Sequence, residues 1–213
     1  MKVLNIFRKP FRYAFYNATL IIIAVNVFVY LLTNMFPNLV YVLGLNPVLF
    51  WGAQMYWQPF TYMFVHGGFT HIFFNMLGLV FFGIAVERAM GSKEFLLMYL
   101  LCGFLSGLIS LAVYTEAGLI HTLLIGASGA IYSMLLAYAV IFPRSQIYIW
   151  GILPVPAPLL IVLYAVIELG SEFFGFQGGV AHLTHLSGFA VAWLYFIVRM
   201  GIHPLKIWKD AYR

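Results

Sequence analysis

Charge is what this sequence has least of. Only 8% of its 213 residues are Asp, Glu, Lys or Arg, whereas a soluble domain carries about 25%. Hydrophobic residues make up 64% of the chain, and its mean hydropathy is +0.98. So few charged side chains cannot provide a polar surface. The composition therefore excludes a soluble globular protein and predicts an integral membrane protein.

Cysteine and aspartate are also scarce. Cys102 is the single cysteine, so the sequence has neither a disulfide framework nor a cysteine zinc cluster, and its apolar surroundings indicate core packing. Asp210 is the single aspartate, which excludes an intramembrane protease built on an aspartate pair. The motif H-E-x-x-H is missing as well, which counts against an intramembrane zinc protease.

The apolar residues form six long runs. A membrane-spanning helix needs roughly 17–25 such residues, whereas the strands of a membrane β-barrel alternate in segments of about ten. We therefore predict an all-α membrane protein, a six-transmembrane-helix bundle. It should form a single domain over residues 1–213, with a core of about 17–200 and short tails. No A-x-A cleavage site follows the first run, so a retained helix is expected there. The predicted spans are 17–36, 70–88, 94–115, 125–142, 155–172 and 180–200.

All eleven basic residues fall on one side of this topology. They lie before span one, after spans two and four, and after span six. Lys and Arg concentrate in cytoplasmic segments, so both termini are expected in the cytoplasm. The same placement explains the net charge of +5 without nucleic acid as a partner. No transit peptide is recognisable, and we expect a prokaryotic inner membrane. The basic residues are Lys2, Arg8, Lys9, Arg12, Arg88, Lys93, Arg144, Arg199, Lys206, Lys209 and Arg213.

Three connections carry further information. The loop 37–69 is uncharged and rich in aromatic rings, which suit the membrane–water interface. Prolines at 154, 156 and 158 prevent a regular helix, so span five should begin near Pro156, with 146–150 along the cytoplasmic surface. The glycine-rich connector 173–179 is suited to move, and span five with this connector is the expected gate.

Polar side chains, which are costly inside a membrane, gather at one depth of the predicted bundle. They belong to spans two, four and six: His66, His71 and Asn75; Ser128; His182 and His185. Each has an ordinary structural interpretation. Ser128 between glycines could be a small-residue helix contact, Asn75 an interhelical hydrogen bond and His185 a core histidine. The four histidines together could instead bind a metal or haem.

A serine nucleophile explains the whole set more economically. Serine needs an adjacent base, which a histidine can supply. Acyl transfer also needs donors for the developing oxyanion, and Asn75, an imidazole N–H and the Ser128 N–H at a helix N-terminus qualify. Gly126 and Gly129 would allow close approach of backbone or substrate. We expect a polar cavity, open to the outer side, lined by His66, His71, Asn75, Ser128 and His185.

Two templates from soluble hydrolases do not apply. "GASGA" is not G-x-S-x-G, because Ala130 stands in the final position, and no βα pattern surrounds it. No acidic residue obviously completes a triad with Ser128. The sequence therefore predicts a Ser–His dyad, with Tyr132, one turn after Ser128, stacked on the histidine ring.

Together the motifs resemble the rhomboid family of intramembrane serine proteases, from about Trp57 to Leu194. "HGGFTHIFFN" has the pattern His-x4-His-x3-Asn, and "GASGAIY" has Gly-x-Ser-Gly-x2-Tyr. "AHLTHLSG" has His-x2-Gly at His185 and Gly188, and "ERAMGS" resembles the family pattern at Glu87 and Gly91. Any one of these motifs is weak, but the four occur in the order that the family has.

The resemblance implies roles for individual residues. Ser128 would be the nucleophile and His185 the general base. The oxyanion hole would be His71, Asn75 and the Ser128 N–H, with His66 in support. The family often has Trp-Arg in the outer loop, where this chain has Trp57 and Gln58, and this difference puts the anchoring of the loop in doubt.

The function so implied is an intramembrane serine endopeptidase that cleaves transmembrane segments of membrane proteins in the lipid bilayer, without a metal or other cofactor. The alternative is a non-catalytic member of the same fold that only binds such segments. A transporter is disfavoured, because no charged pair lies at the predicted midplane.

Overall fold

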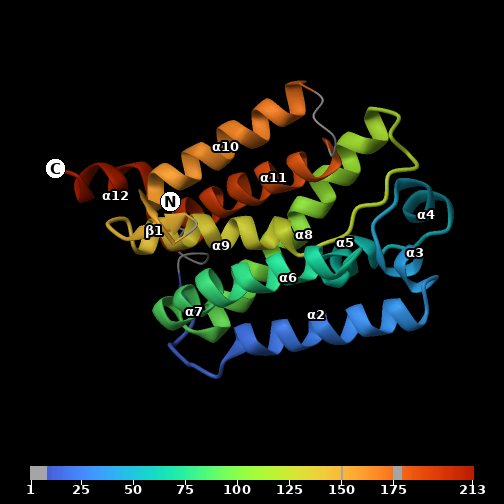
Figure 1. Cartoon of the computed structure of the whole chain (residues 1–213), viewed down its shortest axis with the longest axis horizontal. Coiled ribbons are helices and arrows are strands. Elements are labelled where there is room, and N and C mark those ends of the chain that lie inside the picture. The colour runs from blue at the N-terminus through green and yellow to red at the C-terminus, as the bar shows by residue number, and fades with distance from the viewer. Residues whose placement is uncertain (1–8, 150, 175–178) are drawn as a thin grey trace.

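The computed structural model describes residues 9–149, 151–174 and 179–213, and the side chains of 172–174 and 179–181 are left aside. Helices dominate it (Figure 1). The elements are α2 (Ala18–Met35), α3 (Leu39–Leu43), α4 (Pro47–Gly52), α5 (Gln58–Thr61), η1 (Tyr62–Phe64), α6 (Phe69–Gly78), η2 (Leu79–Gly83), α7 (Ile84–Met90), α8 (Ser92–Glu116), α9 (Ser128–Ile141), β1 (Gln146–Ile149), β2 (Leu153–Pro156), α10 (Ala157–Phe174), α11 (Gly179–Tyr195), η3 (Phe196–Met200) and α12 (Pro204–Ala211).

Each of the six predicted apolar runs is helical, which confirms the helical membrane fold. Four described stretches are long and apolar enough to cross a membrane: Ala18–Met35, Phe69–Met90, Ser92–Glu116 and His182–Met200. Two are shorter, Ser128–Ile141 and Ala157–Ser171. The 14 residues of α9 extend over only about 21 Å, less than the roughly 30 Å of a bilayer's hydrocarbon core. Helix α9 by itself is therefore too short to cross that core.

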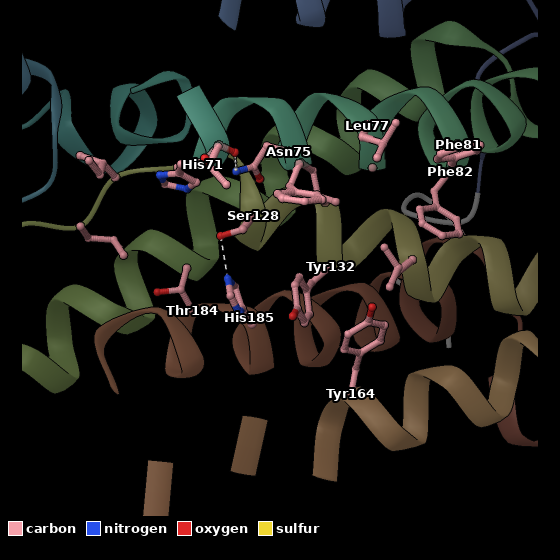
Figure 2. Close-up of a pocket in the computed structure, with 18 residues that line it drawn as sticks. His71, Asn75, Leu77, Phe81, Phe82, Ser128, Tyr132, Tyr164, Thr184 and His185 are labelled. Carbon is pink, nitrogen blue, oxygen red and sulfur yellow. Dashed lines mark hydrogen bonds between the residues drawn. The ribbon is translucent and has the colours of Figure 1, made fainter. Parts of the chain in front are cut away.

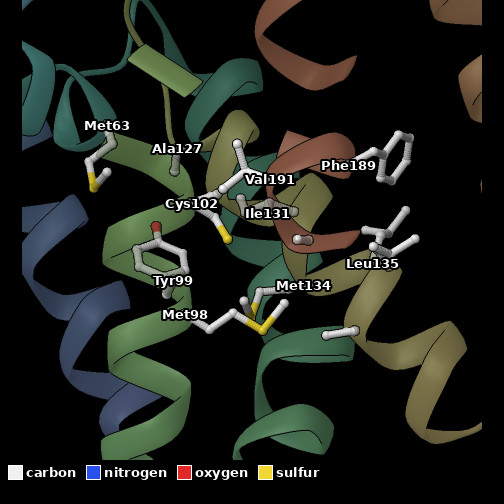
Figure 3. Close-up of a cluster of buried hydrophobic side chains, with 14 of the residues drawn as sticks. Met63, Met98, Tyr99, Cys102, Ala127, Ile131, Met134, Leu135, Phe189 and Val191 are labelled. Carbon is white, nitrogen blue, oxygen red and sulfur yellow. The ribbon is translucent and has the colours of Figure 1, made fainter. Parts of the chain in front are cut away.

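Helix α9 occupies the centre of the bundle. It packs against α8 and α11. Helix α10 packs against α11 and α9, and α2 packs against α6 and α8 at the opposite edge of the bundle (Figure 1). Most side chains of α9 are buried. The core around it combines Cys102 of α8 with Met134 of α9 and Phe189 of α11 (Figure 3). Cys102 is fully buried, as predicted for a packing residue.

Two buried carboxylates connect segments that lie far apart in the sequence. Glu87 accepts hydrogen bonds from the backbone N–H groups of Ala18 at 2.6 Å and Thr19 at 2.8 Å, which satisfies the start of α2. Glu94 pairs with Arg199, with Nε to Oε1 at 2.8 Å and Nη2 to Oε2 at 3.0 Å. A buried charge is tolerated when it is paired and hydrogen-bonded. Glu94 meets that condition through Arg199, whereas Glu87 is held by hydrogen bonds at both of its oxygens.

The connection before α10 is not a helix, as its prolines predict, but it contains a β-hairpin that the sequence did not predict. Residues Gln146–Ile149 and Leu153–Pro156 pair as an antiparallel hairpin, with Gln146 opposite Pro156. The prolines exclude a helix, and a two-stranded ribbon has free edges where a missing N–H is tolerated. Helix α10 begins at Ala157, next to the predicted start. Of the predicted surface segment 146–150 and connector 173–179, residues 150 and 175–178 lie outside the described residues.

The outer loop is anchored by Gln58. Its side chain is fully buried; Nε2 donates to the Tyr41 carbonyl at 2.9 Å, and Oε1 accepts from the Asn46 N–H at 3.1 Å. Trp57 adds a bond from Nε1 to the Val42 carbonyl at 2.8 Å. A neutral amide therefore holds the turns of this loop together, and the doubt raised by the missing arginine is resolved.

Candidate active site

A glycine with a positive φ angle precedes α9. Gly126 has φ of 122° and donates its N–H to the Tyr62 carbonyl at 3.0 Å. A Cβ at this position would lie 2.7 Å from Nε2 of His71. Glycine is thus required both for the backbone conformation and for the close approach of the His71 ring. The helix starts two residues later, at Ser128.

The hydroxyl of Ser128 meets His185 across the bundle. Its Oγ lies 2.7 Å from Nε2 of His185, although 57 residues separate the two in sequence (Figure 2). The His185 ring stacks on Tyr132, with centroids 4.1 Å apart and planes within 10°. The predicted pairing and the predicted stacking are both present, supplied by α9 and α11.

An acidic partner for His185 is also present, contrary to the sequence-based expectation. Glu168 of α10 is 4% exposed, and its Oε1 lies 2.8 Å from Nδ1 of His185. The same carboxylate accepts a hydrogen bond from the Tyr132 hydroxyl and contacts Nδ1 of His182 through Oε2. One signal could have revealed it: an ionisable residue inside an apolar span marks a functional site by default.

The two predicted oxyanion residues lie on α6, facing Ser128 across a cavity (Figure 2). The Asn75 amide nitrogen donates to the His71 carbonyl within α6 at 2.8 Å, and its side chain is largely buried. Ser128 stands at the first position of α9, and the leading N–H groups of a helix have no acceptor within it. The His71 ring, the Asn75 amide and the first residue of α9 therefore line the same cavity.

The cavity differs from the predicted one in its lining. It has a volume of about 740 Å³ and includes His71, Asn75, Ser128 and His185 but not His66. Its walls are mostly apolar, and they come from α6, η2, the segment 124–126, α9, α10 and α11 (Figure 2). The apolar wall residues include Phe74, Phe81, Phe82, Ile131, Leu135 and Tyr164. Ser128 and His185 thus lie along a groove whose walls are mostly apolar, whereas a polar cavity was predicted.

His66 does not line the cavity. Its side chain is buried, and its ring meets that of His71 edge-on, with centroids 5.0 Å apart. Burial, with the neighbouring His71, lowers the pKa of His66 to about 4. A neutral ring in this position can support His71 by packing.

Comparison with known proteins decides the family. The family model of the Rhomboid domain matches residues 53–201, which include every residue assigned to the site. The chain belongs to the rhomboid family.

Named relatives of this rhomboid include RHOMBOID-like protein 4 of Arabidopsis thaliana, 32% identical over 155 residues, covering 71% of this chain and 36% of that protein. RHOMBOID-like protein 1 of the same plant is 30% identical over 138 residues, covering 65% and 33%. Rhomboid protease AarA of Providencia stuartii is 28% identical over 219 residues, covering 89% and 75%. The chain thus spans about a third of the length of the two plant relatives.

The rhomboid motifs account for the packing of the site helices. Gly188, three residues after His185, lies against the backbone of Gly129, the residue after Ser128. Gly91 has φ of 85° and forms the turn between α7 and α8. The glycines of the motifs therefore permit close helix approach and a tight turn.

The four histidines do not form one metal site. The ring of His66 contacts the ring of His71. A separate cluster contains Glu168, His182 and His185, whose possible ligand atoms lie within 4.8 Å of one another. This set has ligand types that could hold a metal ion. Hydrogen bonds between Glu168 and each histidine also account for the cluster.

Proposed function

We propose that this rhomboid is an intramembrane serine endopeptidase that cleaves transmembrane segments of membrane proteins. The observation that carries the proposal is the 2.7 Å contact between the Ser128 hydroxyl and Nε2 of His185. A serine hydroxyl becomes an effective nucleophile when a base lies within hydrogen-bond reach. Here that base comes from a separate helix, and the pair faces a cavity.

In the proposed reaction, Ser128 Oγ attacks the carbonyl carbon of a substrate peptide bond while His185 Nε2 takes the hydroxyl proton. The carbonyl oxygen becomes an oxyanion, which the Ser128 N–H, the Asn75 amide and the His71 ring stabilise. The intermediate collapses, the C–N bond breaks, and His185 delivers its proton to the leaving amine. Water then attacks the acyl-enzyme in the same manner and releases Ser128.

An apolar groove suits an apolar substrate. A transmembrane segment would approach from the lipid, and its end would unwind so that a carbonyl reaches Ser128. The described cavity extends from Ser128 along Phe81 and Phe82, with Tyr164 of α10 on its other wall. Helix α10 and the connector after it are the gate in this proposal, since α10 contributes this wall.

The proposed setting is a prokaryotic inner membrane, with residues 1–213 as one domain. The eleven basic residues on one side of the predicted spans support cytoplasmic termini. Ser128 would then lie in the outer half of the membrane.

The second candidate is a non-catalytic rhomboid that binds transmembrane segments without cleaving them. The apolar lining of the cavity favours binding in either case. An unreactive Ser128 in a folded protein would support this candidate.

Labelling by a fluorophosphonate probe tests the proposal in detergent-purified protein. We expect the wild type to be labelled, and Ser128→Ala and His185→Ala to be unlabelled. Ser133→Ala is the matched control, because Ser133 is a buried serine of the same helix that donates to the Ala130 carbonyl. Labelling of Ser128→Ala, or an unlabelled but folded wild type, would overturn the endopeptidase assignment.

A further inference from the structure

We propose that Glu168 is a positioning residue for the reaction, which holds the ring and the tautomer of His185 so that Ser128, His185 and Glu168 act as one hydrogen-bonded chain. This inference rests on the proposed function and adds a third group to the predicted dyad. The three residues come from α9, α11 and α10, so the chain of contacts crosses three helices.

Both ring nitrogens of His185 lie within hydrogen-bond distance of a partner. Nδ1 lies 2.8 Å from Oε1 of Glu168, and Nε2 lies 2.7 Å from Oγ of Ser128. An ionised carboxylate only accepts hydrogen bonds, so Nδ1 must carry the proton. Nε2 then presents its lone pair to the Ser128 hydroxyl, as a general base requires. The opposite tautomer would lose the contact with Glu168, and its Nε2–H would donate to the Ser128 oxygen instead of accepting the hydroxyl proton.

The surroundings of Glu168 explain why a carboxylate is tolerated in an apolar helix. It is 4% exposed, and a buried charge is costly unless it is paired and hydrogen-bonded. In the described part of the chain, Glu168 contacts the rings of two histidines, His182 and His185, and each contact becomes an ion pair when the ring is protonated. Tyr132 adds a hydrogen bond to Oε1. Its partners therefore belong to the site or adjoin it.

A purely structural role is the competing explanation, because the same contacts tie α10 to α9 and α11. The two explanations can be distinguished because the two carboxylate oxygens have different partners. Oε1 contacts the proposed base, whereas Oε2 contacts His182. His182→Gln should weaken the link between α10 and α11 without removing the Oε1 contact. Glu168→Gln keeps the shape of the side chain and removes the charge.

The positioning role predicts a change in chemistry as well as in rate. The groups that face His185 are His71 from α6, Ser128 and Tyr132 from α9, Glu168 from α10 and His182 on its own helix. Of these, Glu168 in its ionised form stabilises the imidazolium that forms when His185 takes the proton. Without that charge, the imidazolium loses this stabilisation relative to the neutral ring. The acid limb of the pH–rate profile should therefore shift to lower pH.

The experiment measures the second-order rate of fluorophosphonate labelling against pH in full-length purified protein. Glu168→Gln should label about 10²–10⁴-fold more slowly than wild type, since loss of the corresponding carboxylate in a soluble triad costs about 10⁴. Its acid limb should lie at lower pH, and Glu168→Asp should recover part of the rate. His182→Gln should stay within about threefold of wild type. Thermal unfolding shows whether each variant is folded.

The outcomes separate this inference from the proposed function. If the wild type is labelled and Glu168→Gln labels at the same rate, the positioning role fails while the endopeptidase proposal stands. The role also fails if Glu168→Gln and His182→Gln lower the labelling rate equally and leave the acid limb unshifted. That result would mean that Glu168 only holds α10 against its neighbouring helices. An unlabelled wild type, or labelling of Ser128→Ala, removes the proposed function itself.

Discussion

Gly188 of α11 and Gly129 of α9 are in backbone contact: a Cβ at Gly188 would lie 2.2 Å from the Gly129 carbonyl oxygen. Real Cβ atoms essentially never approach so closely. Each glycine is near a member of the reactive pair, Gly129 directly after Ser128 and Gly188 three residues after His185. This contact therefore helps to set the distance between the nucleophile and its proposed base. Small residues serve this purpose in membrane bundles because they let helix backbones approach.

Gly188→Ala should separate α9 from α11 and lower the rate of fluorophosphonate labelling at least tenfold, because the 2.7 Å contact lengthens. The midpoint of thermal unfolding should fall as well. Gly170→Ala on α10 is the matched control, since a Cβ there meets nothing within 4 Å. That variant should keep its labelling rate. Normal labelling by Gly188→Ala would show that the helices adjust without harm to the pair.

Asn75→Ala should lower kcat about 10²–10³-fold with little change in KM, because an oxyanion donor acts mainly in the transition state. His71→Ala should do the same, and both are measured with a fluorogenic transmembrane peptide in liposomes. Asn34→Ala serves as control: the Asn34 amide donates to the Tyr30 carbonyl within α2, just as the Asn75 amide donates to the His71 carbonyl. Equal effects at both asparagines would contradict the oxyanion assignment.

Removing the buried carboxylate of Glu94 by Glu94→Ala should lower the free energy of unfolding by about 3–5 kcal/mol, since it leaves the Arg199 charge without this partner. Asp210→Ala removes the exposed pair of Asp210 with Arg213, at 3.7 Å, and should cost less than about 1 kcal/mol. Denaturant unfolding in mixed micelles compares the two. A small loss for Glu94→Ala would mean that the pair is dispensable.

The stability of the protein should fall as the pH drops from about 6.5 to about 4, in part through His66. Burial lowers the pKa of His66 from 6.5 to about 4, so in this window the unfolded chain binds a proton that the folded state excludes. Stability is therefore fully present above pH 6.5 and decreases toward pH 4. His66→Gln should flatten this part of a thermal-unfolding profile, and a change at the exposed His203 should not. An unchanged slope in His66→Gln would contradict the assignment.

That Ser128 meets a histidine of span six was predictable from the depths of these residues and their complementary chemistry. The choice of His185 followed from Gly188, which stands after it at the spacing of the rhomboid motif. The stacking of Tyr132 followed from its position one helical turn after Ser128. The hairpin before α10 was not predicted, since prolines exclude a helix without specifying what replaces it. The anchoring of the outer loop by Gln58 depends on carbonyls of Tyr41 and Val42, which only the folded loop brings within reach.

The sequence by itself determined that the chain is embedded in a membrane and helical. Long apolar runs with few charges need lipid around them, and in lipid every backbone polar group must be satisfied within the segment. Only the tertiary structure decided that Glu168 meets His185. Span five is apolar over most of its surface, so its periodicity does not fix the rotation of the helix about its axis. That rotation is set by packing against α9 and α11, and it directs the one carboxylate in Ala157–Ser171 toward the histidine.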